Sequence, residues 1–208
     1  MIFIDYPHYS ISQEFVRIVN NLLNTKYEVS DFICVNPSDR NKVFNLDNKY
    51  AIKFPFRTDR YLQEKNALQK LMNGKYYPTL YSFDDQVPLL IMEWINGISI
   101  PEYVQQHKSF PPKFLDAYFD YHLDLINFGY HDCDFKLQEM FYIPDGSYKK
   151  VDYDVLDNSA GLLEMYKREL QEIYPKLKAN DDVAWKSFMS KMAFIEYKTF
   201  WEKYRSEL

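Results

Sequence analysis

Residues 131–139 read HDCDFKLQE, and the interpretation of the whole chain starts from this stretch. It follows a helical pattern over Phe114–Phe128 and precedes a strand pattern over Met140–Ile143. The stretch is therefore predicted to be a loop that carries acidic side chains between two regular elements. Carboxylates held in such a loop suit general-base and metal-binding chemistry.

Three carboxylates in and after this loop form the candidate catalytic group. Asp134 lies on the loop, Glu139 lies at its end, and Asp152 follows a turn-rich hairpin within a strand predicted over Lys150–Tyr153. Carboxylates from adjacent hairpin ends can converge on one divalent cation, which leaves Asp134 to face an incoming hydroxyl. This arrangement suits phosphoryl transfer.

The first half of the chain reads as strands with one inserted helix. Lys53 lies near the end of an apolar strand, and Glu64 lies on the helix that follows. A strand lysine paired with a helix glutamate can be held rigidly against phosphate oxygens. The predicted strands are Phe32–Val35, Lys42–Leu46, Tyr50–Phe54, Thr79–Phe83 and Pro88–Trp94, and the predicted helix is Arg60–Met72.

The second half changes to helical periodicity. Besides the helix over Phe114–Phe128, the pattern predicts helices over Leu162–Leu177 and Val183–Tyr204. The fold class is therefore α+β, and three regions are predicted. These are an N-terminal extension over 1–30 with an amphipathic helix at Gln13–Leu23, a β-rich lobe over 31–95, and a reduced α-helical lobe over 96–208.

Charge and composition disfavour several classes of function. The chain has 30 acidic and 25 basic residues, for a net charge of −5, so a nucleic-acid-binding role is not expected. No run approaches the roughly 18 apolar residues of a membrane helix, and the start lacks the pattern of an export signal. We therefore expect no membrane association and a cytoplasmic protein, with Cys34 and Cys133 as reduced thiols.

The ordered set of motifs resembles the protein-kinase superfamily, including its small RIO-like and aminoglycoside-phosphotransferase-like branches. The resemblance spans Ile33 to about Val155 and implies a bilobal protein-kinase-like fold. It also implies ATP and Mg²⁺ or Mn²⁺ as cofactors. The motifs are Ala51-Ile52-Lys53, Glu64, Leu90-Ile91-Met92-Glu93, Asp134-Phe135-Lys136 and Asp152-Tyr153-Asp154.

The resemblance implies a role for each matching residue. Lys53 would hold the nucleotide phosphates with Glu64 orienting it, and the backbone of Glu93, Trp94 and Ile95 would meet the adenine. Asp134 would orient the nucleophile, with Lys136 near the transferred phosphate, and the metal ligands would be Asp152 and Glu139. Lys136 stands where protein kinases that act on serine and threonine keep a lysine, which favours a protein substrate.

The chain departs from the family pattern at several of these positions. Asn36, Ser38 and Asn41 replace the glycines of the phosphate-binding loop, which predicts weakened nucleotide affinity. Glu139 replaces a metal-binding asparagine. Cys133 replaces the arginine that pairs with an activation-loop phosphate, so we expect no such switch.

Three functions remain open on the sequence alone. The first is a minimal serine/threonine kinase-like phosphotransferase, and the second is a pseudokinase that binds a nucleotide or a regulatory protein partner without turnover. The third is an α+β interaction module whose acidic residues are ordinary turn residues. The sequence leaves the oligomeric state undecided.

Overall fold

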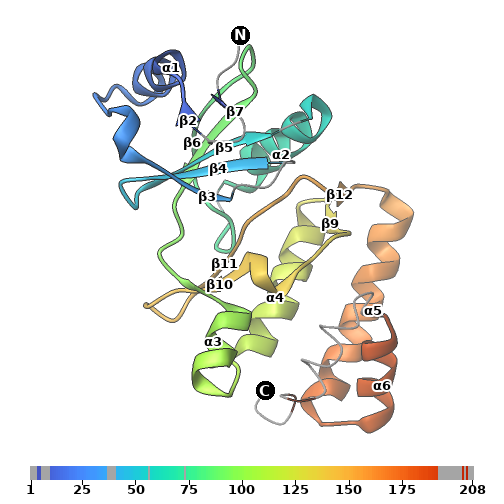
Figure 1. Cartoon of the computed structure of the whole chain (residues 1–208). Helices are drawn as coiled ribbons and strands as arrows, with labels where there is room; N and C mark the ends of the chain where they lie inside the picture. The colour runs from blue at the N-terminus through green and yellow to red at the C-terminus, as the bar shows by residue number, and fades with distance from the viewer. Residues whose placement is uncertain are drawn as a thin grey trace. The chain divides into compact units, whose positions relative to one another are not determined.

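The computed structural model describes residues 4–5, 10–36, 41–55, 57–72, 74–191, 203 and 205. The chain divides into two compact units, each described here by itself. The first comprises Met1–Asn73 with Tyr77–Asn96, and the second comprises Gly74–Tyr76 with Gly97–Leu208. The first unit is dominated by strands and the second by helices (Figure 1), which confirms the predicted α+β class.

A five-stranded antiparallel sheet forms the centre of the first unit, with the strand order β3-β4-β5-β7-β6. Its strands are β3 (Phe32–Asn36), β4 (Asn41–Leu46), β5 (Tyr50–Pro55), β6 (Leu80–Asp84) and β7 (Leu89–Glu93). The hairpin between β4 and β5 turns at Asp47 and Asn48, which both have positive φ. These two residue types tolerate that backbone conformation better than other non-glycine residues.

Helix α1 (Gln13–Leu23) covers one face of this sheet. Ser12 caps it by accepting a hydrogen bond from the backbone N–H of Phe15 at 3.1 Å. The Phe15 ring is fully buried, with its centroid 6.0 Å from that of Phe32 and 6.1 Å from that of Phe44. The amphipathic helix of the predicted N-terminal extension therefore packs on the sheet of its own unit, and its apolar face is not available to a partner.

Helix α2 (Thr58–Leu71) contacts the sheet through the opposite face of β5. Side chains alternate along a strand, so Ile52 points into the core below α1 while Lys53 points to the other side. Lys53 is paired with Val43 of β4 and Leu90 of β7. Strand pairing thus places the predicted lysine in the middle of the sheet, on the face of α2.

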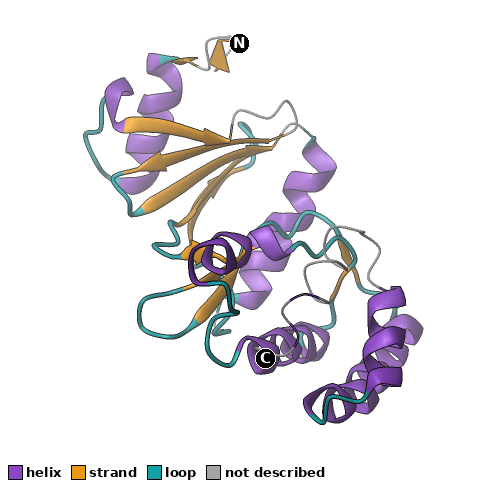
Figure 2. Ribbon diagram, turned by 60° about the horizontal axis from the view of Figure 1, so that its bottom comes forward, coloured by secondary structure: helices purple, strands orange, loops and turns teal. Residues whose placement is uncertain are grey.

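The second unit contains four α-helices and three short strand pairings among the described residues (Figure 2). Strand β10 lies between β11 and β8, and β9 pairs with β12. Gly97, just before β8, has no room for a side chain, because a Cβ there would lie 2.8 Å from the carbonyl oxygen of Tyr142. The elements are β8 (Ile98–Ser99), α3 (Ile100–His107), α4 (Phe114–Asn127), β9 (His131–Asp132), β10 (Met140–Tyr142), β11 (Tyr148–Lys150), β12 (Leu156–Asp157), α5 (Ala160–Lys178) and α6 (Asp182–Lys191).

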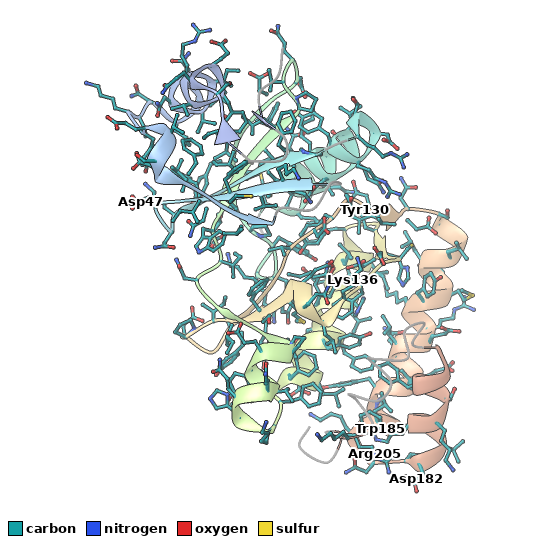
Figure 3. The ribbon with its side chains drawn as sticks, viewed as in Figure 1. Asp47, Tyr130, Lys136, Asp182, Trp185 and Arg205 are labelled. Carbon is teal, nitrogen blue, oxygen red and sulfur yellow. The ribbon has the colours of Figure 1, made fainter. Side chains whose placement is uncertain are left out.

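Aromatic rings fill the interior of the second unit around α4. The rings of Phe110 and Phe114 stack at 4.8 Å, and Tyr121 meets Tyr76 edge to face at 5.9 Å. Near α6, Arg205 pairs with Asp182 at 2.7 Å and lies over the buried ring of Trp185 (Figure 3). None of the helices in the described part has both the length and the apolar character to cross a bilayer.

The structure contradicts one predicted element, adds one that was not predicted, and leaves part of a third untested. The strand predicted over Lys150–Tyr153 is wrong, because β11 ends at Lys150 and Asp152 has φ 70, which no strand residue adopts. Helix α3 was not predicted. The helix predicted over Val183–Tyr204 is described only as Asp182–Lys191, and most of its later residues lie outside the described part of the chain.

Replacing Phe15 tests the packing of α1 on the sheet. Phe15→Ala removes a fully buried ring and should lower the free energy of unfolding by about 3–5 kcal/mol. The measurement is equilibrium urea unfolding followed by circular dichroism. Arg17→Ala, on the solvent side of the same helix, should leave the midpoint nearly unchanged. Equal midpoints for both variants would show that α1 does not pack as described.

Candidate active site

Lys53 and Glu64 form a buried ion pair in the first unit. The ammonium of Lys53 lies 2.6 Å from a carboxylate oxygen of Glu64, and the two side chains are 5% and 1% exposed. Moving a charged group out of water costs free energy, and close pairing with an opposite charge is needed to offset that cost. The structure therefore brings together the two residues that the sequence predicted as a pair, with the ammonium fixed on the sheet.

The sheet face that carries Lys53 has an apolar surface towards its β3 edge. Strand pairing places Ile33, Asn45 and Ala51 side by side across three strands on this face, and Val43 pairs with Lys53 itself. Ile33 is 61% exposed, whereas Val43 and Ala51 are half-buried. These apolar side chains beside a fixed ammonium could meet the two parts of a nucleotide, its flat base and its phosphates.

The predicted hinge begins at the end of β7, where Glu93 is the last strand residue and Trp94 and Ile95 follow it. The backbone N–H of Glu93 donates to Thr79 at 2.8 Å, and the backbone N–H of Trp94 donates to Lys49 at 3.0 Å. Ile95 makes no backbone hydrogen bond to any described residue. Of the three predicted hinge positions, Ile95 is thus the one whose backbone N–H does not donate to a described residue.

The residues that replace the glycine loop join β3 to β4. Asn36 ends β3 and Asn41 begins β4, with a shift in register between Cys34 and Asn36. Ser38 lies outside the described residues. The predicted contact of these three positions with phosphates stays a prediction.

Asp134 and Lys136 lie together on the loop between β9 and the short 3-10 helix Leu137–Glu139 of the second unit. Figure 3 labels Lys136 on this loop. The Lys136 ammonium donates to a carboxylate oxygen of Asp134 at 2.7 Å, and the Asp134 side chain remains 40% exposed. Burial opposes the charge of Lys136, but the hydrogen bond that it donates to Asp134 and the charge of Glu139 outweigh this effect and raise the pKa of Lys136. The loop thus presents a reachable carboxylate with a permanent positive charge beside it.

Lys150, which sequence reasoning missed, lies fully buried below this loop. Its ammonium is 3.2 Å from a carboxylate oxygen of Asp132 and 3.1 Å from one of Glu139. It also donates to the carbonyl oxygens of Val151 at 2.7 Å and Asp152 at 3.1 Å. The sequence does indicate a buried lysine here. Successive side chains of a strand point to opposite faces, so one of the adjacent residues Lys149 and Lys150 had to face inward.

Asp132 connects Lys150 to the rest of the loop. One of its oxygens accepts the Tyr121 hydroxyl at 2.8 Å, and the other accepts the backbone N–H of Asp134 at 3.2 Å. The side chain is 3% exposed. Asp132 therefore acts as a structural anion that sets the backbone of Asp134, whose carboxylate is the reachable one.

Glu139 lies between two ammonium groups. One carboxylate oxygen is 3.3 Å from Lys136 and the other is 3.1 Å from Lys150. Burial raises the pKa of Glu139, and the two lysines only partly oppose this. Because both oxygens already face cations, Glu139 does not fit a metal ligand as its side chain stands here, although the sequence predicts that role.

Asp152 fits a metal ligand better. It follows Lys150 by two residues, its left-handed backbone turns the chain out of β11, and its side chain is half-buried. The described residues contain no group of three or more histidines, cysteines or acidic residues that could by itself hold a metal. Mg²⁺ is commonly held by one or two carboxylates with phosphate oxygens and water as its other ligands, so a single carboxylate suffices where a nucleotide is bound.

A cavity of about 820 Å³ in the second unit is lined by the other side chains of the same loop. Cys133, Phe135 and Leu137 line it, whereas Asp134 and Lys136 do not. His122 also lines it, and its Nε2 has no hydrogen-bond partner among the described residues. Burial lowers the pKa of His122 to about 3, so this ring is neutral. The loop thus turns the side chains of Asp134 and Lys136 away from this cavity.

His131 stacks on Tyr166, with ring centroids 3.5 Å apart. Burial lowers the pKa of this histidine, and its Nδ1 lies 3.6 Å from the sulfur of Cys133. These contacts agree with a structural role for His131. They leave Asp134 as the acid of the loop that a substrate can reach.

Breaking the Lys53–Glu64 pair tests its burial. Glu64→Leu alone strands an ammonium and should lower the free energy of unfolding by about 3–5 kcal/mol. The double variant Lys53→Met/Glu64→Leu should recover most of this loss, because it leaves no unpaired charge. Urea unfolding measures both, and Arg57→Gln, which breaks an exposed ion pair, is the control. A double variant with a lower free energy of unfolding than Glu64→Leu would contradict a buried pair.

Comparison with known proteins finds likeness in structure and not in sequence. No family model matches the sequence, and no curated protein matches it. In WbdD crystallised with a kinase inhibitor, 34% of the chain overlays 62% of this one, with a TM-score of 0.50 and 13% identity. In a structure described as the bifunctional kinase-methyltransferase WbdD, 34% of the chain overlays 64% of this one, with a TM-score of 0.49 and 14% identity.

The match thus takes in about a third of the WbdD chain. At 13% identity the likeness concerns the fold alone. It agrees with the order of motifs in the sequence and with the buried Lys53–Glu64 pair beside a five-stranded antiparallel sheet. The chain has a protein-kinase-like fold.

Proposed function

We propose that the protein is an ATP- and divalent-metal-dependent phosphotransferase that acts on a serine or threonine hydroxyl of a protein. The γ-phosphoryl group would leave ADP and form a bond to the hydroxyl oxygen, while the hydroxyl proton passes to a carboxylate. Three requirements follow: a fixed cation for the phosphates, a metal ligand, and a reachable base beside a positive charge.

The base is supported by the geometry of Asp134, which is the observation that carries this proposal. Its carboxylate is 40% exposed on a loop that is otherwise held by buried contacts, and Lys136 is 2.7 Å away. A carboxylate in this position can accept the proton of an incoming hydroxyl. The Lys136 ammonium can stabilise the negative charge of the transferred phosphoryl group.

The nucleotide is assigned to the sheet face of the first unit. Lys53 is fixed there by Glu64 and would hold phosphate oxygens, while the apolar side chains of Ile33, Val43 and Ala51 would face the base. Ile95 would offer its main chain to the adenine edge. The aliphatic contacts supply binding energy, and the ammonium supplies orientation.

The metal is assigned to Asp152. When bound, a divalent cation neutralises charge on the β- and γ-phosphates. The carboxylates of Asp132, Asp134, Glu139 and Asp152 outnumber the two ammonium groups of Lys136 and Lys150 by two. That excess of negative charge favours a divalent cation at this loop.

A pseudokinase is the second candidate, and one observation favours it. Glu139, at the position where the resemblance implies a metal ligand, is held by two lysines. A protein of this kind would bind a nucleotide or a regulatory partner without turnover. Transfer that depends on Asp134 separates the two functions.

Asp134→Asn should lower phosphate transfer from labelled ATP about 10²- to 10⁴-fold, because the amide cannot accept the hydroxyl proton. Transfer to the protein itself and to a generic serine- and threonine-rich protein is measured with Mg²⁺ and with Mn²⁺. Asp145→Asn, the same change in an exposed turn of the same unit, should have no effect. Chelation of the metal should abolish transfer.

Nucleotide binding is measured first, as a rise in thermal midpoint with ATP and metal, since a ligand of the folded state must raise it. A rise without any transfer would assign the pseudokinase function. If ATP with metal neither raises the thermal midpoint nor supports phosphate transfer, the interaction module remains as the function. Equal transfer by wild type and Asp134→Asn would overturn the role of Asp134.

A further inference from the structure

We infer that the Lys150 ammonium is a built-in cation of the candidate active site and that the Glu139 carboxylate binds this ammonium instead of a divalent metal ion. The catalytic part of this inference, the role of Lys150 in an active site, rests on the proposed function. Its structural part, the pairing of Glu139 with Lys150, stands on the contacts of the second unit alone.

The surroundings of Lys150 have the composition of a cation site. Four oxygens lie within 3.2 Å of its ammonium, two from carboxylates and two from carbonyl groups. The rings of Tyr153 and Phe135 lie 5.2 and 5.8 Å from it and add cation–π contacts.

Strand pairing fixes the position of this ammonium. Lys150 pairs with Met140 in the ladder of β11 and β10, and its backbone N–H donates to the carbonyl of Tyr76 at 2.8 Å. Its backbone carbonyl accepts the Tyr153 hydroxyl at 2.7 Å. With its side chain 0% exposed, Lys150 cannot leave the site by a simple rotamer change.

While both lysines are in place, each carboxylate oxygen of Glu139 already contacts an ammonium group. A divalent cation at its carboxylate would lie beside two ammonium groups that already contact the same two oxygens. Like charges this close repel strongly in a partly buried site. The site therefore works with one metal, at Asp152, and Lys150 supplies the further positive charge.

Lys150 also acts as a positioning residue. It binds the carbonyl of Asp152 and the carboxylate of Asp132, which in turn holds the backbone of Asp134. The predicted metal ligand and the predicted base are thus both positioned through one ammonium.

The first measurement needs neither nucleotide nor metal. In protein with ¹⁵N-labelled lysine, a buried and paired ammonium gives a slowly exchanging Nζ signal, assigned here by its loss in Lys150→Arg. Glu139→Gln should shift this signal, because it removes one of the two carboxylates at the ammonium. Glu164→Gln, the same change at an exposed position of α5, should leave it in place. An Nζ signal that Glu139→Gln does not move would overturn the pairing.

The second measurement counts metal ions. Mn²⁺ bound per protein is determined by electron paramagnetic resonance with a non-hydrolysable ATP analogue. One ion is expected for wild type and one for Glu139→Gln, whereas two ions falling to one in Glu139→Gln would overturn the inference. Asp152→Asn should lose the ion.

The two measurements separate this inference from the proposed function. If no Mn²⁺ binds with the analogue, the proposed metal-dependent transfer is wrong, and the Nζ signal still decides whether Glu139 holds Lys150. If one Mn²⁺ binds but no phosphate is transferred, the pseudokinase function is assigned and the inference stands.

Discussion

An ammonium group can be kept in a protein interior only if oxygens replace its water shell, and Lys150 imposes this constraint on the second unit. The oxygens come from separate parts of the chain: Asp132 at β9, Glu139 before β10, and the carbonyls of residues 151 and 152. Each of these segments is short and has little regular structure of its own. Their conformations are therefore coupled, because moving any one of them strands a buried charge.

The two units fix their lysines in different ways, and the difference matters for function. Lys53 is held by one close carboxylate on a helix, at the face of a sheet whose edge is open and apolar. Such a lysine is oriented and still close to a surface where a ligand can be bound. Lys150 is surrounded on all sides and can only position its neighbours. Lys136 stands between these cases, since it is partly exposed and contacts Asp134 directly.

Much of the fold could be predicted because local patterns and tertiary packing agree. Helix α1 matches its predicted bounds, since Ser12 caps it and its apolar face meets the core. Helix α3 was missed, although Ser99 as its cap and Pro101 in its first turn are start signals, because it is short and has only two buried residues. The strand over Lys150–Tyr153 was wrong because periodicity carries no information about the left-handed backbone of Asp152.

The sequence predicts a residue of the candidate site correctly where the role of that residue depends on a single partner. The family resemblance pairs Lys53 with Glu64, and in the structure the ammonium and the carboxylate are 2.6 Å apart. The grouping of Asp134 with Lys136 on one loop was also available from the sequence. The surroundings of Glu139 were not, since they depend on which of two adjacent lysines in β11 faces inward. That choice is made by the pairing of β11 with β10 and by the hydrogen bond from Lys150 to Tyr76.

Residues 74–76 belong to the second unit although the chain on both sides of them belongs to the first. Tyr76 is buried, contacts Tyr121 and accepts the backbone N–H of Lys150. A fragment that begins at Gly97 would lack this tripeptide and leave the edge of β11 and the ring of Tyr121 uncovered. The helical half of this protein therefore cannot be isolated by cutting at one place. Expressing it alone would require the tripeptide to be supplied in trans or grafted through a new linker.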